Sequence, residues 1–134
     1  MNIENFADLL QAARTQALPQ RLLLVFASVE LPEDASPAQR AGFEAGQGGA
    51  LVPALCVDKS PYEVPSFEAL AQEATQLIPD WRFVVAAAMS ADPQNAASQA
   101  EVDACLQAMV QAIKRGDMDR YLVFDRKGLP LVLQ

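Results

Sequence analysis

The chain has 134 residues, of which 51% are hydrophobic and 20% are charged, a composition that predicts a single globular domain over residues 1–134 and excludes a disordered protein. Its formal net charge of −7 opposes binding to nucleic-acid phosphates or anionic membranes, so neither partner is expected. No apolar run approaches the roughly 20 residues that span a bilayer and no basic secretory signal opens the chain, so we expect a cytoplasmic protein.

The first third of the chain predicts two helices and a strand. Residues 4–16 place apolar side chains on one face at helical spacing, and Pro19 ends this helix. Residues 21–29 form a short, continuous apolar run, which predicts a central strand. Ser36 and Pro37 are typical of the N-cap and first residue of a helix, which is expected to end at the glycines that follow it.

The middle of the chain predicts a second strand, a third helix and a third strand. Residues 50–57 form the second strand, and Pro53 places it at a sheet edge or at a bulge, because proline has no backbone N–H. Ser66 predicts the N-cap of the third helix, and Pro79 its end. Residues 82–89 predict the third strand, although alanine is a weak strand former.

The last third predicts a long helix and a hairpin. Ser98 and Glu101 match a capping box, and basic residues followed by Gly116 favour the end of this helix. Residues 121–124 and 129–133 predict two strands joined by a four-residue turn.

This order of helices and strands predicts the fold class. Alternating helices and strands indicate crossover connections and a mainly parallel or mixed sheet. We therefore expect an α/β fold, or an α+β fold, in a single-domain sandwich. Its mixed sheet would have about five strands, with helices packed against it and a C-terminal β-hairpin.

The absence of histidine limits the chemistry that the chain can perform. Without histidine there is no Ser-His or Cys-His catalytic pair, and the commonest transition-metal ligand is missing. The two cysteines, Cys56 and Cys105, lie far apart in the sequence and form no CxxC motif, so both are expected to be reduced thiols. We expect no metal and no cofactor.

Polar residues follow three of the predicted strands. Ligands bind beyond the carboxyl ends of parallel strands in open sheets, and the residues at those ends are Ser28, Glu30, Cys56, Asp58, Lys59, Ser60, Ser90 and Asp92. If the strands are parallel and adjacent, these residues share one rim. The interpretation that we prefer is that they are polar because strands end at the protein surface.

Within this rim, the candidate catalytic residues are Cys56, Asp58 and Lys59, and the candidate ligand-binding residues are Glu30, Ser60 and Ser90. A cation at Lys59 would favour the thiolate of Cys56, but side chains three residues apart on a strand point to opposite faces. Cysteine is also among the residues that are most often buried, so we prefer a core position for Cys56.

Two further features favour structural roles. The glycines at positions 46, 48 and 49 follow a predicted helix and precede a strand, whereas a phosphate-binding loop follows a strand and precedes a helix. A helix end and a turn therefore explain them better. Trp81 begins the third strand, where we expect a half-buried anchor of the sheet rather than a platform for a ligand.

Residues 43–53 and 56–59, together with residues 5–10 and 124–126, resemble a family of small uncharacterised bacterial proteins. Some members carry the label ribonucleotide reductase alpha subunit. The residues do not support this label, because that enzyme resembles a large barrel with a radical cysteine, a redox cysteine pair and nucleotide sites. The resemblance implies no site and no function.

Two classes of function remain open. The first, which we prefer, is a non-enzymatic interaction or regulatory protein that acts through a protein partner or a homo-oligomer, such as a symmetric dimer. The alternative is a small-ligand-binding protein, or a thiol or carboxylate enzyme, with its site at the carboxyl ends of the strands.

Overall fold

The computed structural model describes residues 3–17, 19–31, 33–45, 49–91 and 98–131. Within these residues one open antiparallel sheet has the strand order β2-β1-β3-β4. Its strands are β1 (Gln20–Glu30), β2 (Ala50–Lys59), β3 (Phe83–Ser90) and β4 (Leu122–Asp125). The helices are α1 (Phe6–Arg14), α2 (Pro37–Glu44), α3 (Phe67–Leu77) and α4 (Gln99–Arg115), and η1 (Pro61–Glu63) is a short 3-10 helix. The fold is therefore α+β.

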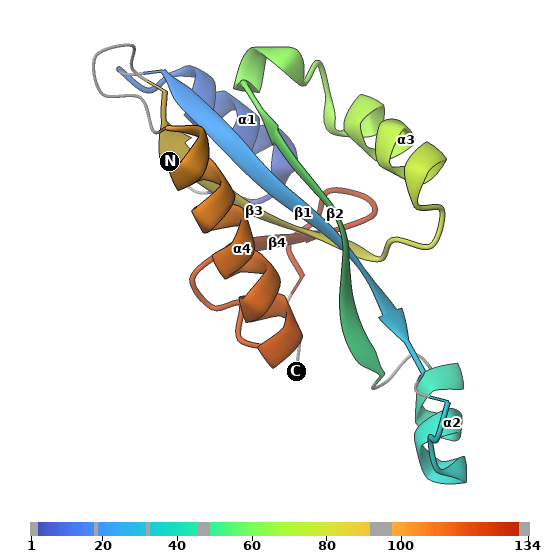
Figure 1. Ribbon diagram of the computed structural model, residues 1–134. Coiled ribbons are helices and arrows are strands. Elements are labelled where there is room, and N and C mark those ends of the chain that lie inside the picture. Colours follow the sequence, from blue (N-terminus) through green and yellow to red (C-terminus); the bar gives the residue numbers. More distant parts are fainter. Residues whose placement is uncertain (1–2, 18, 32, 46–48, 92–97, 132–134) are drawn as a thin grey trace.

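Helices cover both faces of the sheet. Successive side chains of β1 point to opposite faces, so Leu22, Leu24 and Phe26 pack in the core beneath α1 and α3, whereas Leu23 and Val25 pack beneath α4. Figure 1 shows α4 on one face and α1 and α3 on the other. Because both faces of β1 are buried, its sequence is a continuous apolar run, and the prediction of a central strand is confirmed.

An aromatic cluster fills the core between the sheet and helices α1 and α3. The ring of Phe6 lies 5.1 Å from that of Phe67 and 5.4 Å from that of Phe124, measured between ring centroids. The ring of Trp81 meets that of Phe26 edge-on at 5.1 Å. Trp81 is only 1% exposed, so the expected half-buried anchor is in fact a fully buried core residue.

The prediction of a mainly parallel or mixed sheet is wrong, since all three strand pairs are antiparallel. The connection between β1 and β2 returns the chain along the neighbouring strand, with α2 at its far end (Figure 1). An α-helix of eight residues rises about 12 Å, whereas a strand of eleven residues spans about 35 Å. Helix α2 is therefore too short to carry the chain back along the sheet, and none of its residues is buried.

The predicted five strands are also too many, because the structure has four in its described part. The turn after β4 leads to residues 129–131, which lie beside β4 and form one isolated bridge, between Phe124 and Pro130. The second strand of the expected C-terminal hairpin is thus reduced to this bridge. Residues 132 and 133, which the prediction included, lie outside the described residues.

Candidate functional site

The antiparallel sheet divides the predicted rim between its two ends. Strands β2 and β3 run in the same direction on either side of β1, so Lys59 and Ser90 lie at the same end of the sheet. Glu30 ends β1 at the opposite end, eight residues from Leu22, which pairs with Lys59. That separation corresponds to about 25 Å. Asp92 lies outside the described residues.

Three of the rim residues already interact with neighbouring groups. Asp58 forms an ion pair with Arg21 of the adjacent strand, and the Lys59 ammonium lies 3.2 Å from the Glu73 carboxylate on α3. Ser60 is the N-cap of η1, and its hydroxyl accepts a hydrogen bond from the amide two residues later at 3.3 Å. These contacts hold the end of β2 against β1, α3 and η1. They explain why an acid, a base and a hydroxyl occur at these positions, and no catalytic role is needed to explain them.

Cys56 is exposed, so the preferred prediction of a core position is wrong. It pairs with Val25 on the α4 face of the sheet, whereas Lys59 pairs with Leu22 on the face of α1 and α3. The Lys59 ammonium therefore lies on the other face and is paired with Glu73. Partial burial raises the pKa of the Cys56 thiol, which is the opposite of what an activated nucleophile needs.

Alkylation of the Cys105→Ser variant should report this raised pKa directly. Because the thiolate is the reacting form, the rate at Cys56 should still be rising above pH ~8.5, the ordinary thiol value. The measurement is the rate of iodoacetamide modification from pH 6 to pH 10, followed by intact mass, with the urea-unfolded variant as the control. A plateau below pH ~8 would contradict the prediction.

Two hollows on the surface involve other parts of the chain. One of about 390 Å³ lies between α1, the first turn of α3 and the turn after β4, where Phe6, Phe67 and Leu129 are among its lining residues. The other, of about 270 Å³, lies beside β4 and includes Tyr121 and Leu131. Neither is lined by a residue of the predicted rim. In the described residues no three His, Cys, Asp or Glu side chains form a group that could hold a metal ion.

No helix within the described ranges combines the length and the apolar character that crossing a membrane requires.

The outer edge of β2 is defined by the direction of the backbone groups in β1. The amide of Ala91 donates to the Pro19 carbonyl at 2.8 Å, and the amide of Arg82 donates to the Ala27 carbonyl at 2.8 Å. The odd-numbered residues of β1 thus direct their backbone groups toward β3. Because these groups alternate in direction along a strand, the even-numbered residues direct theirs toward β2.

This alternation leaves backbone groups of β2 pointing outward. The even-numbered residues of β1 pair with Leu55, Val57 and Lys59, whose backbone groups therefore point into the sheet. Cys56 and Asp58 lie between them, so their N–H and C=O groups point away from β1. Among the strands of the described residues, β1 is the only one that pairs with β2, and the edge is open at these positions.

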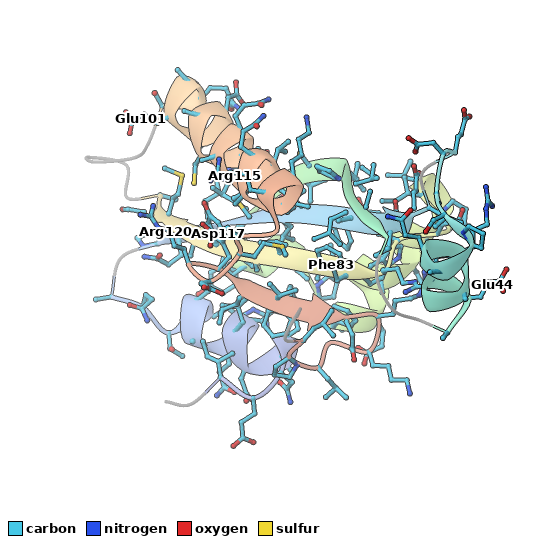
Figure 2. The ribbon with its side chains drawn as sticks, turned by 90° about the horizontal axis from the view of Figure 1, so that it is seen from below. Glu44, Phe83, Glu101, Arg115, Asp117 and Arg120 are labelled. Atoms are coloured by element: carbon cyan, nitrogen blue, oxygen red, sulfur yellow. The ribbon has the colours of Figure 1, made fainter. Side chains whose placement is uncertain are left out.

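The opposite edge of the sheet is covered by the chain itself. The amide of Asp125 donates to the Leu129 carbonyl at 2.8 Å, and the amide of Leu131 donates to the Val123 carbonyl at 2.9 Å. Residues 129–131 thus occupy the outer side of β4. Figure 2 shows β2 in green and β4 in red at opposite edges, with β1 and β3 between them.

The residues of the open edge are mostly uncharged. No charged residue occurs in residues 50–57, and Ala54 and Cys56 are exposed. Pro53 lies where the register of β1 and β2 shifts, so this proline is both at an edge and at a bulge, as its missing N–H led us to expect. The bulge and the proline interrupt the edge on one side, which leaves residues 54–59 as its accessible part. We call these residues the β2 edge.

In comparisons with protein-family models, with curated proteins and with solved structures, no match to this chain was found. The resemblance to a family of small bacterial proteins therefore stays a prediction. Sequence reasoning drew attention to residues 56–60 for their side chains, whereas the feature that the structure adds there is the exposed backbone. Pro53 was the only signal in the sequence that pointed to an edge.

Proposed function

We propose that the protein is a non-enzymatic interaction module that binds an extended segment of a protein partner along the β2 edge. The observation that carries this proposal is the difference between the two sheet edges. The chain covers β4 with residues 129–131, whereas Cys56 and Asp58 of β2 direct their backbone groups outward. Exposed strand edges of this kind accept an added strand, whose backbone hydrogen bonds supply affinity.

The surroundings of the β2 edge support a protein as the partner. The apolar residues of β2 suit an extended peptide with alternating apolar side chains. The net charge of −7 disfavours nucleic acids and anionic membranes. The two unpaired cysteines are consistent with a reducing compartment, so we propose that the protein acts in the cytoplasm.

Proline at position 56 tests this function. Because the Cys56 amide points outward, Cys56→Pro removes a donor from the β2 edge without removing a hydrogen bond to β1. Peptides selected from a random displayed library against the wild-type protein should bind Cys56→Pro at least about tenfold more weakly, which corresponds to one lost hydrogen bond. Affinities would be measured by fluorescence polarisation with the selected peptides.

Cys56→Ser is the matched control, since it keeps the backbone donor and changes the side chain at the same position. The selected peptides should bind it within about threefold of wild type, well inside the change expected for one hydrogen bond. Circular dichroism checks that Cys56→Pro is folded, and Cys56→Lys, which places a charge at the edge, provides a second blocking variant. Peptides that bind both blocking variants as tightly as wild type would overturn the proposal.

A further inference from the structure

We infer that the segment bound at the β2 edge is strand β2 of a second copy of this chain. The two strands pair antiparallel about a two-fold axis, so that the two sheets join into one continuous eight-stranded sheet. In this arrangement Cys56 of one copy lies opposite Cys56 of the other. The inference rests on the proposed function, and it names the partner that this function leaves open.

The pattern of charges along β2 selects an antiparallel pairing with itself. The charged residues Asp58 and Lys59 lie at one end of the strand, and the rest of it is uncharged. Antiparallel pairing places the charged end of each strand beside the uncharged end of the other, and it brings the apolar middles together. A parallel pairing would instead bring like charges side by side, which destabilises a strand pair.

The register of the two β2 strands follows from Cys56 and Asp58, whose backbone groups point away from β1. If Asp58 paired with Asp58 of the second copy, two carboxylates would face each other. If Cys56 paired with that Asp58, then Leu55 would lie opposite a lysine. A shift in the other direction would place the pairing on the bulge beside Pro53, which has no N–H to donate.

Pairing Cys56 with Cys56 avoids these conflicts. Leu55 of each copy then lies opposite Val57 of the other, on the face of α1 and α3, where both side chains already pack against the core. Apolar cross-strand pairs of this kind stabilise a sheet. Asp58 lies near the neutral Ala54 of the other copy. Cys56 of each copy directs its backbone N–H and C=O groups toward the other copy. The two cysteines therefore become a hydrogen-bonded cross-strand pair, with about 5.5 Å between their Cα atoms.

The net charge of −7 on each copy opposes this association, but the charges near the β2 edge are balanced. Arg21 neutralises Asp58, and Glu73 neutralises Lys59, both within the same copy. The edge is thus a locally neutral part of an acidic protein, where two copies can approach. One added strand buries less area than a standard interface, so we expect a dissociation constant in the micromolar range that falls with added salt.

Cross-linking at Cys56 tests the dimer and its register together. In the Cys105→Ser background, bismaleimidoethane should join two copies through Cys56 in high yield at micromolar protein concentration, because the paired Cα atoms lie within disulfide range. The matched control carries Cys56→Ser, Cys105→Ser and Leu122→Cys, which moves the exposed thiol to the covered edge. It should remain monomeric on a denaturing gel. Equal cross-linking of both proteins would overturn the inference.

Sedimentation velocity and a synthetic peptide separate the failure of this inference from the failure of the proposed function. The wild-type protein should sediment as a concentration-dependent dimer, and Cys56→Pro as a monomer. The peptide is a fluorescent copy of residues 50–59 carrying Cys56→Ser. If the wild-type protein is monomeric but binds this peptide in a Cys56→Pro-sensitive manner, the dimer is overturned and the proposed function stands. If it is monomeric and binds neither this peptide nor any peptide of the displayed library at the β2 edge, both fail. A dimer that persists in Cys56→Pro uses another surface and overturns the inference alone.

Discussion

Replacing Trp81 by alanine is expected to lower the free energy of unfolding by about 3–5 kcal/mol, which is a large part of the 5–15 kcal/mol that usually stabilises a domain. The indole is 1% exposed and meets the ring of Phe26 edge-on. Its N–H donates to the Thr75 hydroxyl at 3.0 Å. The guanidinium of Arg126 lies 4.8 Å from the ring centroid and donates to the Trp81 carbonyl at 2.6 Å. Alanine leaves a cavity and also removes the surface on which Arg126 lies.

The measurement is urea unfolding followed by far-ultraviolet circular dichroism, since Trp81 is the only tryptophan and the variant has no indole fluorescence. Trp81→Phe is the matched control. It keeps an aromatic ring and loses the hydrogen bond to Thr75, so a smaller loss of about 1–2 kcal/mol is expected. If Trp81→Ala unfolds within 1 kcal/mol of wild type, the assignment of Trp81 to the core is wrong.

The ends of the helices were predictable from the sequence because capping acts between close neighbours. Ser66 accepts a hydrogen bond from the amide of Ala69 at 3.1 Å, and Ser98 accepts one from the amide of Glu101 at 3.2 Å. Gly116 ends α4 with φ +69°, a left-handed conformation that glycine adopts without strain. In each case the residue type and its spacing carry the physical cause.

The directions of the strands were not predictable in the same way. An apolar run shows that β1 is buried on both faces, but nothing within the run shows which strands lie beside it. That outcome depends on how the chain returns from β1 to β2. The short helix α2 lies at the end of the β1–β2 hairpin and does not cross the sheet. The ion pair between Arg21 and Asp58, which are 37 residues apart in the sequence, exists only because β1 and β2 pair in one register.

The same limit applies to the candidate site. The sequence drew attention to residues 56–60, for which we preferred polar strand ends at the surface and kept a side-chain site at a parallel rim as the alternative. Pro53 supplied the correct signal, since a missing N–H is tolerated at an edge. The availability of the Cys56 backbone is a property of the sheet as a whole, because it requires β2 to be outermost and to pair with β1 in the register that directs Cys56 away from β1.

Replacing Arg14 by methionine is expected to destabilise the protein by about 1.5–3 kcal/mol, the usual contribution of a charged hydrogen bond. Arg14 Nη2 donates to the Val64 carbonyl at 2.6 Å, and its Nε donates to the Pro61 carbonyl at 3.2 Å. The Tyr62 hydroxyl donates back to the Arg14 carbonyl at 3.1 Å. These contacts fix η1, which is separated from the end of β2 by Ser60 alone, onto α1. Methionine keeps most of the apolar stem and removes the donors.

The loss should therefore reach the β2 edge as well as the global stability. In Arg14→Met, the amide of Lys59 should exchange with solvent faster than in wild type, because η1 no longer restrains the end of β2. Arg40→Met is the matched control, since Arg40 is exposed and its side chain donates a long hydrogen bond, of 3.3 Å, to the Glu33 carbonyl. This variant should unfold within 0.5 kcal/mol of wild type. If the two substitutions have equal effects in urea unfolding, Arg14 does not hold η1 on α1. If the amide exchange rate of Lys59 is unchanged in Arg14→Met, the end of β2 is held by its pairing with β1 alone.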